Sequence, residues 1–167
     1  TQGSTVTRAG DVATITGKNF SDFYRQDEGS IFCRYKNSSL DTSNIRAVWG
    51  LGTITGQDSS LRSPKSGSSR IRLHFGNYFS PSNSNLFLIS TEYRNSIVAY
   101  NQFENLLLMD GKPDFVSASP HTNRNNLYGI SIGTRTLAGS SALCGHISRL
   151  TYFPKRLPNE QLQALTR

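Results

Sequence analysis

The sequence has few cysteines, few acidic residues and no long hydrophobic run, and each shortage argues against a class of protein. No apolar stretch approaches the roughly 20 residues of a membrane-spanning helix, and no signal peptide is expected. Cys33 and Cys144 stand far apart without a C-x-x-C or histidine-rich spacing, so a structural zinc site is not expected. We expect two reduced cysteines buried in the core, with a disulfide between them as the alternative.

The 11 acidic residues are too scattered to predict a catalytic site. A glycosidase needs two carboxylates flanking the scissile bond, and no expected strand carries two at i, i+2 spacing. No G-x-S-x-G motif surrounds a serine, and the three histidines lie in unrelated segments. We therefore expect no enzymatic activity and no cofactor. The acidic pairs that a hairpin could bring together are Asp110 with Asp114 and Glu92 with Glu104.

A calcium site is not favoured by the sequence either. Calcium takes about six to eight oxygen ligands, which are often supplied by closely spaced aspartates. The nearest approach to such a cluster is Asp110 and Asp114 with the carbonyl groups near Gly111, and no D-x-D run is present. The net charge of +7 makes a cation site less favourable still.

Short alternating segments separated by Gly, Asn, Ser and Pro are what the chain has in abundance, and they predict an all-β fold. Arg94-Asn95 is interpreted as a hairpin link and Asp110-Gly111 as a tight turn. The aromatic segment 19–24 is expected to form a helical turn that buries Phe20 and Phe23. The longest loop is expected at 56–69. The expected strands lie at 5–7, 11–16, 30–36, 45–51, 70–75, 86–93, 96–101, 103–109, 115–116, 127–132 and 145–153. In the strand 30–36, Ile31, Cys33 and Tyr35 are expected to share one face.

The last segment, 144–165, predicts a closing strand and a short helix. Pro154 ends the strand because it lacks an N–H, and Pro158 can open a helix at its first turn. Leu162 and Leu165 share one helical face, which would dock on the sheet. In the strand, simple alternation places Ile147, Arg149, Thr151 and Phe153 on one side and His146, Ser148, Leu150 and Tyr152 on the other.

The pattern GxIxRLTYFPxRLxxxQLQALT in this segment resembles the end of laminin-G-like, concanavalin A-like jelly-roll domains of bacteriophage tail fibre and tail spike proteins. The resemblance continues in TVTRAGDVATITGKNFSDFYRQDEGSIF, in SIVAYNQF with DG shortly after, and in LYGISIG. It implies a two-sheet antiparallel sandwich in which a short C-terminal helix covers one end and the closing strand pairs near the first strand. One departure is Pro158, which stands where the family usually has a Ser or Thr helix cap.

The resemblance also implies what kind of protein contains this domain. Residues 1–167 are expected to form a single domain, and the start at Thr1 with one methionine, Met109, indicates a part of a longer protein. That protein would be a virion protein of the phage tail, with this domain towards its C-terminus and a homotrimer as its assembly. Two functions stay open: a non-catalytic carbohydrate-binding module for host recognition, or a structural element for trimerisation or virion assembly without a ligand.

The basic net charge predicts an anionic partner, such as an acidic host-surface glycan or lipopolysaccharide phosphates. Arg70, Arg72 and His74 alternate along one strand, and Arg62 and Lys65 precede them in the expected loop. Together they predict a basic ligand-binding face, and the alternative is an edge strand protected by charge. Nucleic acid is not the expected partner, because exposed aromatic residues do not interleave with this row.

Aromatic side chains complete the candidate site. Glycan binding uses aromatic faces beside amide and hydroxyl groups. Trp49, Tyr78 and Tyr93 are the main candidates, and Tyr100 and Tyr128 are weaker ones. Tyr78 and Tyr93 are favoured because they adjoin loops, whereas an aromatic residue inside a strand is more often part of a core.

Overall fold

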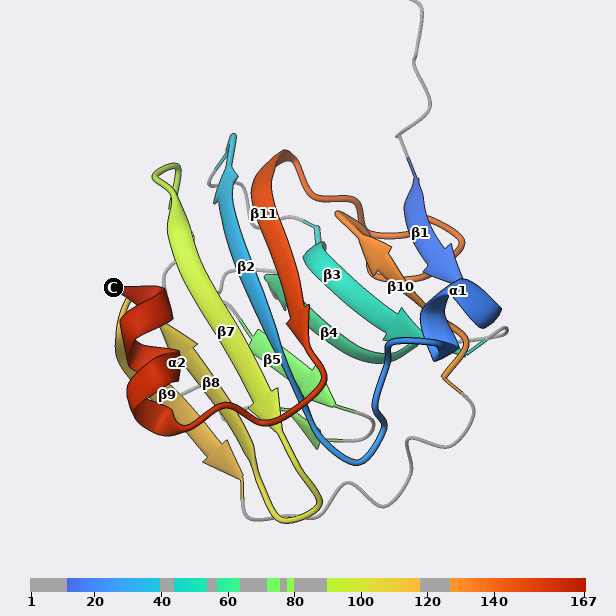
Figure 1. Ribbon diagram of the computed structural model, residues 1–167. Coiled ribbons are helices and arrows are strands. Elements are labelled where there is room, and N and C mark those ends of the chain that lie inside the picture. The colour runs from blue at the N-terminus through green and yellow to red at the C-terminus, as the bar shows by residue number, and fades with distance from the viewer. Residues whose placement is uncertain are drawn as a thin grey trace, which may run out of the picture.

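The computed structural model describes residues 12–39, 44–53, 57–63, 72–75, 78–79, 90–117 and 127–167. Within these ranges, eleven strands form two antiparallel sheets, and two short helices complete the fold (Figure 1). This confirms the predicted two-sheet antiparallel sandwich with a short C-terminal helix. Neither helix in this part of the chain is long and apolar enough to cross a membrane.

The two sheets differ in size, and the chain passes back and forth between them. The six-stranded sheet has the order β1 (Ala13–Thr16), β10 (Gly129–Ile132), β3 (Arg46–Gly52), β4 (Gln57–Ser63), β5 (Arg72–Phe75), β6 (Tyr78–Phe79). The five-stranded sheet has the order β11 (Gly145–Phe153), β2 (Gly29–Asn37), β7 (Arg94–Tyr100), β8 (Asn105–Met109), β9 (Lys112–Ser117). The closing strand β11 therefore pairs with β2, while the first strand β1 pairs with β10 in the other sheet.

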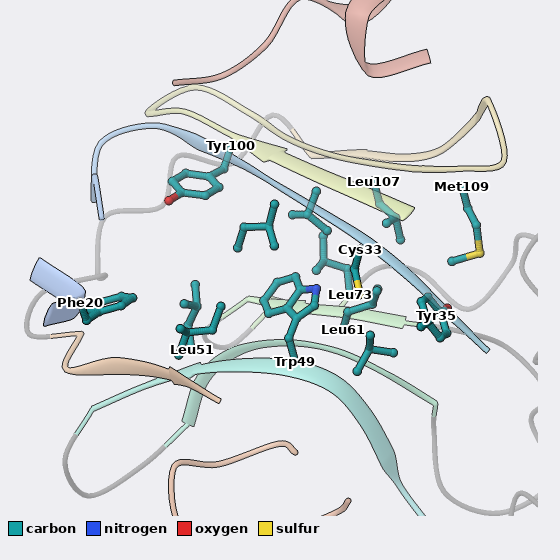
Figure 2. Packing of buried hydrophobic residues seen from close by; sticks show 14 residues of the cluster. Phe20, Cys33, Tyr35, Trp49, Leu51, Leu61, Leu73, Tyr100, Leu107 and Met109 are labelled. Atoms are coloured by element: carbon teal, nitrogen blue, oxygen red, sulfur yellow. The ribbon is translucent and has the colours of Figure 1, made fainter. Parts of the chain in front are cut away.

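The main core fills the space between the sheets. Figure 2 shows Trp49 near the middle of this cluster, with Phe20 towards one end and Tyr35 and Met109 towards the other. Alternation explains the contribution of β2, in which Ile31, Cys33 and Tyr35 all point inward, as the sequence predicts.

A second apolar cluster lies on the outer face of the five-stranded sheet. Its floor consists of Phe32, Ile97, Ala99, Leu106 and Leu108. The helix α2 (Asn159–Thr166) covers this floor and packs on β7 and β8, with Leu157, Leu162 and Leu165 in the cluster (Figure 1). The helix thus covers a face of the sandwich and not one end of it. No side chain caps its first turn, where Pro158 is the N-cap residue.

Two connections and the position of one strand differ from the predictions. The expected loop 56–69 begins as the strand β4, which pairs with both β3 and β5. Arg94 and Asn95 do not link two strands but begin β7. The strand β5 is flanked by β4 and, at His74 and Phe75, by β6, so the predicted role of charge in protecting an edge does not apply to His74.

A β-bulge in β11 corrects the predicted alternation of its side chains. The register shifts between Ile147 and Arg149, leaving Ser148 without a partner on β2. As a result, Ile147 shares the inward side with Leu150 and Tyr152 and not with Arg149. Simple alternation is therefore wrong across the bulge, because the extra residue reverses the phase of the strand.

The turn between β8 and β9 has the predicted hairpin chemistry. Met109 pairs with Lys112, and the two residues between them, Asp110 and Gly111, have φ angles of 49° and 75°. Positive φ at both central positions defines a type I′ turn, which matches the twist of adjacent strands. The Asp110 carboxylate also accepts a hydrogen bond from the backbone N–H of Asn95 and pairs with Arg94.

The helical turn α1 (Lys18–Ser21) begins earlier than predicted, after Gly17, whose φ of 59° suits glycine. Phe20 is buried as expected. Phe23 is not fully buried and keeps 37% of its surface exposed. The first helix and α2 lie on opposite sides of the molecule (Figure 1).

The two cysteines have opposite surroundings. Both are free, but Cys33 is buried in β2 whereas Cys144 is exposed just before β11, so its expected place in the core is wrong. Burial raises the pKa of the Cys33 thiol to about 12.

We predict that a thiol reagent labels only one cysteine of the folded protein. The thiolate is the reactive form, and at about pH 8 the raised pKa and burial keep Cys33 protonated and inaccessible. Mass spectrometry after labelling should show one adduct on Cys144 in buffer and two adducts in denaturant. Two adducts on the folded protein would contradict the burial of Cys33.

Candidate anion-binding face

The structure scatters the residues that the sequence proposes for ligand binding. Lys65 and Arg70 lie outside the described residues. Arg72 and His74 lie in β5 and Tyr78 in β6, and only their backbone placement is described. Arg62 lies in β4 opposite Arg72, and only 7% of its surface is exposed. A buried Arg62 offers little surface to a ligand, which corrects its expected place in an exposed loop.

Trp49 is a core residue and not a ligand-binding one. None of its surface is exposed, since it lies in β3 between the two sheets (Figure 2). Tyr100 is buried too, and burial raises the pKa of its hydroxyl group, which donates a hydrogen bond to the Arg25 carbonyl. No glycan can reach either ring in this fold, which corrects the expectation for both aromatic residues.

Tyr93 is the predicted site residue that the structure places in a suitable environment. It precedes β7 and keeps 42% of its surface exposed. The guanidinium carbon of Arg34 and the ammonium nitrogen of Lys36 each lie 5.1 Å from the centre of its ring. Cations at this distance are attracted by the π-electrons, so the ring holds two positive charges together at the surface.

The strand β11 adds a third cation to this group. Arg149 is directly opposite Arg34 in the antiparallel pair, and His146 is opposite Lys36. The Arg149 guanidinium lies 5.5 Å from the centre of the Phe32 ring, which places it on the outer face of the sheet. Arg34, Arg149 and His146 are exposed and Lys36 is half-buried. We call Arg34, Lys36, Arg149 and Tyr93 the β2–β11 basic face.

The backbone fixes the spacing of these charges. Arg34 and Lys36 are two residues apart on one strand, so their Cα atoms are about 7 Å apart. Arg34 and Arg149 are cross-strand neighbours at roughly 5 Å. The Ser148 hydroxyl group, in the bulge, donates a hydrogen bond of 3.3 Å to the Arg34 carbonyl and ties the two strands together at this point. The cations thus project from a hydrogen-bonded sheet.

No carboxylate neutralises this face among the residues that the structure describes. The salt bridges found there join Lys18 to Asp22, Arg25 to Asp27, Arg94 to Asp110 and Arg156 to Glu104. The cations of the β2–β11 basic face take part in none of them. Arg149 makes one side-chain hydrogen bond, to the Thr151 hydroxyl group at 3.1 Å. Uncompensated cations on a rigid surface are what an anionic ligand requires.

Of the two acidic pairs considered for catalysis or calcium, Glu92 and Glu104 lie apart. Glu92 precedes β7 and Glu104 precedes β8, so the antiparallel register puts them at opposite ends of this hairpin. Asp110 pairs with Arg94, and the side chain of Asp114 is not described. Within the described part of the chain, no three His, Cys, Asp or Glu side chains gather closely enough to hold a metal ion.

Arg34 and Lys36 were missed because sequence reasoning followed the inward face of their strand. The alternation that directs Ile31, Cys33 and Tyr35 into the core also directs Arg34 and Lys36 outward. The alternation along this strand therefore already indicates that Arg34 and Lys36 are on its outer face. Arg149 was hidden by the bulge, because unbroken alternation places it beside the buried Ile147.

Comparisons with solved structures identify the fold. A carbohydrate-binding module (CBM40) of the Ruminococcus gnavus IT-sialidase, bound to α2,3-sialyllactose, has a TM-score of 0.62 at 16% identity, over 84% of this chain and 83% of that one. The Trypanosoma rangeli sialidase in complex with sialic acid has a TM-score of 0.70 at 13% identity. That match covers 93% of this chain and 26% of the sialidase.

A third similar structure is the SAP-like pentraxin of Limulus polyphemus, with a TM-score of 0.60 at 10% identity over 82% of this chain and 68% of that one. No protein-family model and no curated protein matches the sequence. The chain therefore has the concanavalin A-like sandwich fold seen in carbohydrate-binding modules and pentraxins. At these identities the similarity shows the fold alone.

Proposed function

We propose that this domain is a non-catalytic carbohydrate-binding module that recognises an anionic glycan through the β2–β11 basic face. The observation that carries the proposal is a group of three cations that no described carboxylate neutralises: Arg34 and Lys36 lie over the exposed Tyr93 ring, and Arg149 is opposite Arg34 on the next strand. The similar CBM40 structures, which are bound to sialyllactose, support a glycan ligand of this charge.

The chemistry of the face suits a carboxylate, sulfate or phosphate group on a sugar. Arg34 and Arg149 offer planar guanidinium groups that can donate paired hydrogen bonds to such an anion. Lys36 adds a compact charge along the strand, and Tyr93 limits the freedom of both β2 cations before the ligand arrives. Less entropy is then lost on binding. Exposed His146 and Ser148 supply further polar groups at the same surface.

The proposal includes the larger protein and the location that the sequence suggests. The resemblance to phage tail fibre and tail spike domains supports a place in a virion, within a homotrimeric protein that attaches to host surface glycans. Non-catalytic binding is supported by the engagement of Asp110 and Glu104 in ion pairs with arginines, which leaves neither as a free acid or base.

The double variant Arg34→Ala/Arg149→Ala tests the site. We expect it to bind 3′-sialyllactose about 10- to 100-fold more weakly than the unmodified domain, since a hydrogen bond to a charged group contributes about 1.5–3 kcal/mol. Calorimetric titration measures the affinity, with uncharged lactose as the reference ligand. Raising the salt concentration should weaken binding, because both charges are exposed and screened.

The matched control is Lys18→Ala/Arg25→Ala, which removes the same number of positive charges from exposed ion pairs elsewhere. It should bind as the unmodified domain does, and both double variants should melt at nearly the same temperature. Equal weakening in both would mean that net charge alone attracts the ligand.

The non-catalytic assignment has its own test. Chromatographic sizing of acidic polysaccharide after incubation with the domain should show uncut chains, and shortened products would contradict the non-catalytic assignment.

A further inference from the structure

A cavity of about 210 Å³ lies between the two sheets at the end where α1 packs. Its walls come from α1 and the residues after it, from β1, β3 and β10 of one sheet, and from β2 and β11 of the other. The inward side chains Leu150 and Tyr152 of β11 line it. The cavity therefore lies on the opposite side of this sheet from Arg149 and the β2–β11 basic face.

Aromatic rings form one wall of the cavity. Phe20 and Tyr24 are stacked, with ring centres 4.5 Å apart. Phe23 packs edge-on to Phe20 at 5.7 Å and lies 5.5 Å from Tyr152. The remaining wall is aliphatic, with Ile130 among its residues. The lining is thus composed entirely of apolar and aromatic side chains.

The cavity opens to solvent beside two exposed apolar residues. Phe23 keeps 37% of its surface exposed and Ile15 keeps 36%, although both also line the cavity. At the same end, the Tyr152 hydroxyl group accepts a hydrogen bond of 2.7 Å from the Arg25 N–H, which holds this ring in place. The cavity therefore borders the surface at Phe23 and Ile15.

We propose that this cavity is a binding site for a compact aromatic ligand, a single ring with a short alkyl substituent. An enclosed apolar cavity of about 150 Å³ lined by Leu, Ile and Phe binds benzene, and the cavity here has a similar apolar and aromatic lining. The larger volume here admits two or three further carbon atoms. Rings pack edge-to-face or offset against other rings, and Phe20, Phe23, Tyr24 and Tyr152 provide those surfaces. This inference does not depend on the proposed function.

The test uses ethylbenzene as the probe. We expect saturable binding by calorimetry with a Kd on the order of 0.1 mM, since a ligand of this size makes few contacts. NMR should show magnetisation transfer from the ethylbenzene protons to the methyl groups of Ile130. The variants Leu150→Phe and Ile130→Phe fill the cavity and should each weaken binding at least about tenfold.

Two outcomes would overturn the site: no binding by the folded, unmodified domain, or binding that persists in both folded cavity-filling variants. The NMR measurement on the unmodified domain tests the location even if a filled variant does not fold. The control is Arg34→Ala/Arg149→Ala, which lies on the outer face of the sheet and should bind ethylbenzene unchanged. Loss of ethylbenzene binding in that control would contradict a separate internal site.

Discussion

A chain that ends at Cys144 is expected not to fold. This truncation removes β11, which pairs with β2 along nearly its whole length, and with it the inward side chains Leu150 and Tyr152. It also removes α2, so both faces of the five-stranded sheet lose apolar cover. Circular dichroism should show no cooperative melting transition, and gel filtration should show an expanded or aggregated chain. A cooperative transition would contradict the essential role of β11.

A shorter truncation separates the two contributions. A chain that ends at Phe153 keeps β11 but exposes the outer cluster that Leu157, Leu162 and Leu165 cover. We expect it to lose at least about 4 kcal/mol of unfolding free energy, because burying one leucine side chain contributes roughly 1.5–3 kcal/mol. An unchanged free energy would mean that the helix adds nothing to the fold.

The Trp49→Ala variant is expected to lose about 3–5 kcal/mol of unfolding free energy, the range for truncating a large aromatic residue in a core. Trp49 has no exposed surface and lies near the middle of the main cluster. The surrounding strands cannot close the gap, since each is held by hydrogen bonds to neighbours in its own sheet. Urea denaturation followed by circular dichroism measures the loss.

The control for this variant is Phe103→Ala, which removes an aromatic ring that is 68% exposed. Its effect should stay within about 0.5 kcal/mol. If Trp49→Ala is folded at low temperature, it should still bind sialyllactose, because the ring does not reach the surface. A selective loss of glycan binding with unchanged stability would instead restore Trp49 as a ligand-binding residue.

Much of the fold was predictable from local pattern. The alternation in β2, the Asp110-Gly111 turn and the leucine spacing in α2 each depend on neighbours in sequence, and each was predicted correctly. The resemblance supplied the sandwich itself. What failed depended on contacts between distant segments: nothing local shows that residues 57–63 pair between two strands, or that β11 joins β2 and not β1.

The candidate site was less predictable than the fold. The sequence shows a basic row within one strand, whereas the β2–β11 basic face combines residues of β2 and β11 with Tyr93, which directly precedes β7. Tyr93 was selected for its position near a loop, but its partners Arg34 and Lys36 precede it by more than fifty residues in the sequence. Such a group becomes visible only when strand order and register are known.

The bulge at Ser148 also has a consequence for how molecules of this protein meet at high concentration. β11 is the edge of its sheet, and a long regular edge invites a strand of another molecule to add to it. The bulge breaks the regular run of backbone donors and acceptors, and the exposed Arg149 beside it places a charge there. The same irregularity that turns Arg149 outward thereby discourages edge-to-edge aggregation along the longest exposed edge that the structure describes.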